Sequence, residues 1–126
     1  FDLIFHPVSN CYIEKVEPVF RECYRILKKG GALLGGYDTG INFIYDENEE
    51  QITYSLPFNP LKNPAYFEEF MANGLGVQFS HTLEEQIGGQ LQAGFRLTHL
   101  YEDTNGQGNL HQHNVPSFVA TRSVKE

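Results

Sequence analysis

The pattern of apolar and polar positions predicts a strand, a helix and a second strand at the start of the chain. Residues 1–5 form a short apolar run, typical of a strand covered on both faces, and Pro7 ends it. Between residues 16 and 28, apolar side chains recur at three- and four-residue steps, as in an amphipathic helix that two glycines then terminate. Residues 32–34 form the next buried strand. This order predicts a parallel pair of strands joined by a right-handed crossover.

The middle of the chain loses this regularity. Residues 41–45 and 51–56 are strand-like runs around a polar, acidic tip, which predicts a hairpin, and three prolines interrupt the loop that follows. A short helix is expected over residues 65–72, with three side chains pointing inward: Phe67, Phe70 and Met71. We therefore interpret residues 41–79 as an insertion or cap outside the sheet.

The regular pattern returns after residue 80. Thr82 and Glu85 match a capping box that opens a helix. Three apolar residues four apart mark one face of that helix: Leu83, Ile87 and Leu91. Strands are expected over residues 95–101 and 117–124, with a polar loop between them.

Composition narrows the classes of function. The net charge is −7 and there is no run of Lys or Arg, so direct binding to nucleic acid is disfavoured. No apolar run approaches the ~20 residues that cross a bilayer, so no membrane span is expected. Two cysteines are too few for a disulfide-stapled fold, so we expect reduced thiols in a cytoplasmic protein. His111 and His113 lack supporting ligands nearby, so we predict a solvated loop and no metal site.

Several motifs in this order resemble one known family. They are F-D-L-I-F at residues 1–5, C-Y-R-I-L-K-K-G-G-A-L-L at residues 23–34 and P-S-F-V-A at residues 116–120. Together they resemble the C-terminal half of a class I S-adenosylmethionine-dependent methyltransferase of the methyltransferase domain 11 type. Lys29 replaces the Pro that is usual in the family. The resemblance covers residues 1–40 and 80–126.

The resemblance implies an α/β fold and a single partial domain over residues 1–126. Its sheet would be a partial Rossmann-like methyltransferase sheet, made of strands 4, 5, 7 and 6 with crossover helices, and residues 41–79 would be an α+β insertion. The family's glycine-rich loop and the acidic residue that holds the cofactor's ribose would both precede Phe1. We therefore expect that the natural beginning is missing. We also expect the isolated chain to bind S-adenosylmethionine poorly and to be inactive.

The resemblance also supplies candidate cofactor contacts. It places His6, Pro7 and Val8 beside the methionine end of S-adenosylmethionine. His6 is also a candidate base, because the unperturbed pKa of a histidine side chain lies near neutrality, or it only turns the strand end. Methyl transfer to a good nucleophile depends mainly on positioning, so no catalytic residue is assigned.

The candidate substrate residues are Tyr12, Tyr37 and Asp38. Tyr12 lines the same pocket or packs elsewhere. Tyr37 and Asp38 follow the fifth strand, at the rim where family members hold substrate. Asp38 accepts a hydrogen bond from a substrate amine or hydroxyl, or it is a solvated turn carboxylate.

The expected partners are a small-molecule methyl acceptor and a second copy of the chain. With the first strand absent, residues 1–5 would form an exposed edge that pairs with another chain in a homodimer. The competing interpretation is a non-catalytic interaction or oligomerisation module derived from the same fold. A nucleotide-binding oxidoreductase is disfavoured because no G-x-G-x-x-G follows a strand.

Overall fold

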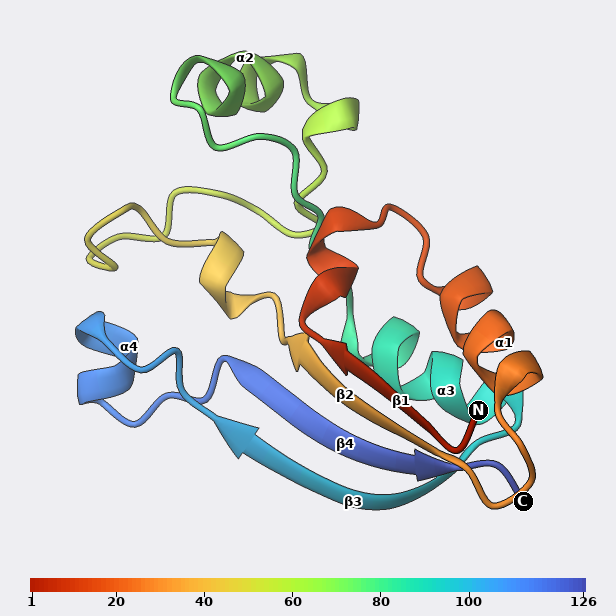
Figure 1. Cartoon of the computed structure of the whole chain (residues 1–126). Helices are drawn as coiled ribbons and strands as arrows, with labels where there is room; N and C mark the ends of the chain where they lie inside the picture. Colours follow the sequence, from red (N-terminus) through yellow and green to blue (C-terminus); the bar gives the residue numbers. More distant parts are fainter.

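A computed structural model describes all residues from 1 to 126 and has an α/β fold (Figure 1). Its strands are β1 (Leu3–Pro7), β2 (Ala32–Asp38), β3 (Arg96–Asp103) and β4 (Phe118–Val124). Its α-helices are α1 (Glu17–Ile26), α2 (Pro64–Ala72), α3 (Gly89–Ala93) and α4 (Gly108–Gln112). Three 3₁₀ turns cover Ser9–Tyr12, Ile41–Phe43 and Pro60–Lys62, and a π-helical turn covers Glu84–Gly88.

The four strands form one sheet in the order β1-β2-β4-β3. β1 and β2 are parallel, and β4 runs antiparallel to both β2 and β3. This arrangement confirms the expected parallel pair and the expected partial Rossmann-like sheet of strands 4, 5, 7 and 6. β1 lies at a free edge of the sheet.

One face of the sheet carries the core, because α1 and α3 pack on it (Figure 1). The core joins α1 and its flanking residues to one face of the sheet, and Ala93 of α3 packs against it partly buried. Its eight buried residues are Val16, Phe20, Cys23, Leu27, Leu33, Tyr37, Phe95 and Val119. The other face is open, and Phe5 on β1 is 72% exposed. The expectation that residues 1–5 are covered on both faces is therefore wrong for this chain.

Both strands of the parallel pair run further than the sequence predicted. Pro7 belongs to β1 because an edge strand can include a residue without an N–H donor. β2 passes through Gly35 and Gly36 to Asp38, since β1 and β4 pair with it on both sides. Gly35 is required there, because an added Cβ would lie 1.9 Å from the hydroxyl of Tyr37.

The segment 41–79 lies outside the sheet (Figure 1). The predicted hairpin is reduced to a 3₁₀ turn and one antiparallel bridge between Tyr45 and Ile52. The predicted helix is present as α2, but Phe67 and Met71 on it are exposed. The segment is held by an aromatic cluster instead: Phe43, Tyr54, Phe58, Tyr66 and Phe70.

The two ends of this segment lie together. A Cβ built on Gly40 would be 4.0 Å from the carbonyl oxygen of His81. Between them, the chain leaves the end of β2 and returns to the start of the following helix. The 41–79 segment therefore leaves and rejoins the rest of the domain at one place.

The helix after Thr82 begins as predicted but presents a different face. Thr82 and Glu85 form the capping box in both directions. Leu83 and Leu91 are about half exposed, whereas Gln86 and Gln90 are buried. The π-helical turn over Glu84–Gly88 explains this difference, since it shifts the positions that meet the sheet.

The expected polar loop between β3 and β4 contains a short helix, α4, with a buried Leu110. His111 and His113 are exposed on and just after it. No helix of the structure combines the length and the apolar composition that a membrane span requires.

Candidate functional site

The candidate site lies where the carboxyl ends of β1 and β2 meet, because parallel strands end at the same edge of a sheet. His6 is half-buried near this end of β1, and its Nε2 lies 2.7 Å from Oδ1 of Asn10. Pro7 is the last residue of β1 and is exposed on the open face. Val8 follows, and its amide donates to the carbonyl of Gly36 at 2.8 Å.

Val8 has an unusual backbone. Its φ of 55° lies in the left-handed region, which β-branched residues rarely adopt. Such a conformation costs on the order of 1–3 kcal/mol and tends to occur at functional sites. The turn at Val8 directs the chain from the sheet into the 3₁₀ turn Ser9–Tyr12. The three candidate cofactor contacts therefore form one tightly turned strand end.

The candidate substrate residues separate in the structure. Tyr12 is 68% exposed. Tyr37 is fully buried in the core, where its ring packs edge-on against Phe20 with centroids 5.9 Å apart. The expected position of Tyr37 at the rim is wrong, because the longer β2 points this side chain toward α1. Burial also raises the pKa of Tyr37, so its hydroxyl stays protonated.

Asp38 is the last residue of β2 and is half-buried. Its Oδ1 accepts from the amide of Gly40 at 2.7 Å, and its Oδ2 accepts from Nδ2 of Asn42 at 2.9 Å. Burial raises the pKa of this carboxyl, although both hydrogen bonds act in the opposite direction. The carboxylate has no Lys or Arg partner among the ion pairs of the structure. Asp38 is therefore not a solvated turn residue.

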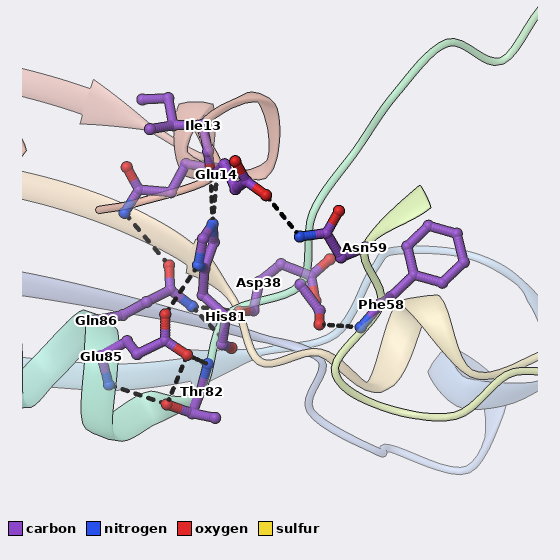
Figure 2. Close-up of polar contacts among 11 residues, drawn as sticks. Ile13, Glu14, Asp38, Phe58, Asn59, His81, Thr82, Glu85 and Gln86 are labelled. Carbon is purple, nitrogen blue, oxygen red and sulfur yellow. Dashed lines mark hydrogen bonds and ion pairs between the residues drawn. The ribbon is translucent and has the colours of Figure 1, made fainter. Parts of the chain in front are cut away.

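A buried polar network links the two strand ends behind Asp38 (Figure 2). The Asn10 side chain is 2% exposed and donates to Oε1 of Gln86 at 3.4 Å. Gln86 Nε2 donates to the carbonyl of Asp38 at 2.7 Å. The network thereby fixes the loop after β1 relative to the end of β2. Sequence reasoning missed both residues, because an Asn in a turn and a Gln in a helix normally face solvent.

His81 is the second part of this network (Figure 2). Its Nε2 lies 3.0 Å from the carbonyl of Asn10 and 2.7 Å from that of Ile13, so this nitrogen carries a proton. Its Nδ1 lies 3.2 Å from Oε2 of Glu85. Burial raises the pKa of Glu85, but hydrogen bonds from His81 and Thr82 more than offset this, so the net shift is downward. The His81 ring thus faces three acceptor oxygens.

The 41–79 segment is attached to the same loop. Asn59 Nδ2 donates to Oε2 of Glu14 at 2.9 Å (Figure 2). The amide of Phe79 donates to the carbonyl of Cys11 at 2.7 Å. These bonds hold the segment over the carboxyl end of the sheet. A cavity of about 250 Å³ lies between Asp38 and the aromatic cluster.

No three His, Cys, Asp or Glu side chains gather closely enough to hold a metal ion. Cys11 and Cys23 are both free thiols. Burial raises the pKa of each thiol, which disfavours the reactive thiolate. The chemistry of the site therefore rests on Asp38, His6 and the surrounding amides and rings.

Comparison with known proteins shows similarity to methyltransferases. The sequence profile described as "Methyltransferase domain" matches residues 1–35. Over 132 aligned residues, the chain is 39% identical to the "Uncharacterized methyltransferase YbaJ" of Bacillus subtilis (strain 168), which covers 99% of the chain. The chain is related to the class I S-adenosylmethionine-dependent methyltransferases. It spans about half, 51%, of the length of the Bacillus relative.

Solved structures show the same fold at lower identity. An S-adenosylmethionine-dependent methyltransferase from Mesorhizobium loti aligns with a TM-score of 0.71 and 17% identity, over 99% of this chain and 62% of its own. The [4+2]-cyclase SpnF aligns with a TM-score of 0.57 and 12% identity, over 99% of this chain and 50% of its own. The methyltransferase-like sheet is thus confirmed. The second match shows that the fold does not by itself define a reaction.

Proposed function

We propose that this chain is the substrate-side half of an S-adenosylmethionine-dependent methyltransferase that acts on a small molecule. The observation that carries the proposal is the 39% identity to a methyltransferase over 99% of the chain. The structure supports it with a parallel strand pair and with a cavity of small-molecule size at the carboxyl end of β2. A narrow cavity of this kind suits a small acceptor better than a macromolecular surface.

The residues present fit one wall of a cofactor site. When bound, S-adenosylmethionine supplies an electrophilic methyl group. His6, Pro7 and Val8 form the strand end that would lie beside it, and the left-handed turn at Val8 fixes their direction. β1 has no neighbour on its outer side, so the other wall of the site is not formed by residues 1–126. We infer that the isolated chain binds the cofactor weakly and is inactive.

The remaining residues would position the acceptor. Asp38 lines the cavity, and Asn10, Gln86 and His81 hold the two strand ends in register behind it. Because methyl transfer depends on alignment of the two reacting atoms, such a rigid frame is what the reaction requires. Tyr12 stays a candidate only for the outer rim, since it is mostly exposed.

The test is cofactor binding with and without a completed sheet. The part of the Bacillus relative that precedes its matched region would be joined before Phe1 to give a chimera. Calorimetry with S-adenosylhomocysteine should show binding to the chimera and at least about tenfold weaker binding to the 126-residue chain. A folded chimera that does not bind would contradict the proposal and favour a non-catalytic module.

We also propose that the chain on its own forms a homodimer through β1. β1 is a free edge, and Phe1, Leu3 and Phe5 are all more than half exposed on it. Such an edge pairs readily with another strand. Sedimentation of the wild-type chain should give a dimer, and a Phe5→Lys variant should shift it to the monomer. A wild-type monomer at high concentration would contradict this proposal.

The cellular location belongs to the same set of proposals. Two free thiols and a net charge of −7 suit a protein of the cytoplasm.

A further inference from the structure

The cavity beside Asp38 has an unusual lining. It measures about 250 Å³ and lies between the end of β2 and the 41–79 segment. One carboxylate and a set of aromatic rings form most of its wall: Asp38, Phe43, Tyr45, Tyr54, Phe58 and Phe70. No Lys, Arg or His contributes to the lining. The cavity therefore combines negative charge with ring surfaces and offers no positive group.

The rings are held in fixed orientations by one another. Phe58 is 2% exposed and stacks on Phe43 with centroids 5.3 Å apart. Tyr54 and Phe70 meet Phe58 at steep angles, with centroids 5.6 and 5.1 Å away. Tyr54 is fixed further because its hydroxyl donates to Oε1 of Glu69 at 2.7 Å. Phe58 is stacked against both Phe43 and Tyr66, so the ring surface left for a ligand belongs to the partly exposed Tyr45, Tyr54 and Phe70. A ring face attracts an organic cation placed over it.

Asp38 adds a formal charge that the protein itself leaves unpaired. Its two hydrogen bonds come from the neutral Gly40 amide and the neutral Asn42 side chain. A half-buried carboxylate without a cation is unfavourable, and a bound cation would relieve this cost. The unpaired carboxylate of Asp38 thus indicates a positively charged ligand.

The surface next to the cavity is also negatively charged. A wider hollow of about 810 Å³ shares Asn42, Tyr45, Tyr54 and Phe70 with it and so opens into it. The hollow is rimmed by four carboxylates: Asp46, Glu47, Glu49 and Glu69. Residues 38–79 contain seven Asp and Glu residues but a single Lys, a net charge of −6. This field attracts cations and repels phosphate or carboxylate ligands.

We propose that this cavity binds a small organic cation, an amine or quaternary ammonium group, as the recognised part of the ligand. The identification of that ligand as the methyl acceptor rests on the proposed function. The binding itself does not, because it requires neither the cofactor nor turnover. The cavity selects its ligand by charge and ring contact together.

The test compares two probes that differ in one atom. Choline carries a quaternary nitrogen, and 3,3-dimethylbutan-1-ol has a neutral carbon in its place. The chain has seven Tyr and no Trp, so its fluorescence comes from tyrosines, of which Tyr45 and Tyr54 line the cavity and the Tyr45→Leu variant identifies one contribution. Choline should bind the full 126-residue chain at least about tenfold more tightly than the neutral isostere.

Two variants, each with a matched control, distinguish the contribution of the Asp38 charge to choline binding from that of the aromatic rings. Asp38→Asn keeps the shape of the site and should lower choline affinity about tenfold, whereas Asp2→Asn, on an exposed residue far from the cavity, should not. Tyr45→Leu removes one ring and should lower choline affinity about threefold or more. Tyr101→Leu, on the open face of the sheet, should leave choline affinity unchanged.

The outcomes decide the proposal without reference to cofactor binding. Equal binding of choline and its isostere, or unchanged choline affinity in both folded cavity variants, would overturn it. So would the absence of choline binding in both the chain and the chimera. A chimera that binds choline but not S-adenosylhomocysteine would leave the cation site standing and remove the methyltransferase function.

Discussion

Two regions of the molecule are built in contrasting ways. One is the sheet layer, which is the four-stranded sheet with α1 and α3, and the other is the 41–79 segment. In the sheet layer, α1 and α3 pack on alternate residues of hydrogen-bonded strands, and contacts as tight as that between Gly35 and Tyr37 leave no spare volume. The 41–79 segment has a single nine-residue helix, two 3₁₀ turns and one isolated bridge, and its rings hold it together. The first region fixes positions by backbone pairing and close packing, the second by mutual contact of large side chains. A frame fixed by backbone pairing thus carries a wall fixed by contacts between side chains.

The strongest test of this contrast is Gly35→Ala. The added methyl would lie 1.9 Å from the Tyr37 hydroxyl, and Tyr37 is fully buried and cannot move aside. We expect a loss of about 3 kcal/mol in the free energy of unfolding, measured by urea denaturation. Gly36→Ala is the matched control, because its methyl would meet only Val8 at 3.4 Å. Similar stability of both variants would show that the sheet layer is less tightly packed than we describe.

Next in size is the effect of His81, which ties the loop after β1 to the helix that follows Thr82. His81→Leu leaves the buried carbonyls of Asn10 and Ile13 without their donor, so we expect a loss of about 2 kcal/mol. His81→Gln places an amide donor near the Nε2 position and should recover more than half of that loss. Thermal unfolding followed by circular dichroism measures both variants. Equal stability of the Gln and Leu variants would show that the hydrogen bonds of His81 do not stabilise the fold.

Phe58→Leu tests the aromatic cluster. The smaller, non-aromatic side chain should cost about 1.5 kcal/mol. Because the sheet does not depend on this ring, hydrogen exchange should accelerate at amides of residues 41–79 and stay unchanged in β2 and β4. Uniform acceleration over the whole chain would mean that the two regions unfold as one unit.

Asp38→Asn should have the smallest effect on stability and the opposite sign. Since the folded state raises the pKa of Asp38 above the usual 3.8, it favours the neutral acid. The wild type therefore loses stability relative to the variant as pH rises through that raised pKa, and the difference vanishes below 3.8. We expect Asn to be slightly more stable than Asp at neutral pH. A variant that is less stable at neutral pH would show that the carboxylate is favourably held.

The contrast between the two regions also decides what the sequence could predict. The strand–helix–strand unit followed from its periodicity, because amphipathic helices and buried strands repeat their apolar positions regularly. The extent of β2 did not follow, since Gly35 and Gly36 resemble a turn until the pairing on both sides is known. The burial of Gln86 and Gln90 depends on a π-helical turn that leaves no periodic signal.

In the candidate site, Asp38 was found because it follows a strand. The rings opposite it were not, because contacts such as Tyr54 with Tyr66 join positions without any fixed spacing. The position of Tyr37 was predicted wrongly for the same reason, because Gly35 and Gly36 were interpreted as the end of the strand. Motif spacing thus predicted the strand ends of the site but not the aromatic cluster that faces them.

The meeting of Gly40 with His81 has an evolutionary consequence. A segment that leaves and rejoins its domain at one point can be lengthened, shortened or replaced at little cost in chain entropy. The strands and their connecting helices would be inherited unchanged while the segment diverged. Relatives of this chain can then acquire new ligand preferences by exchanging one loop while the sheet is kept.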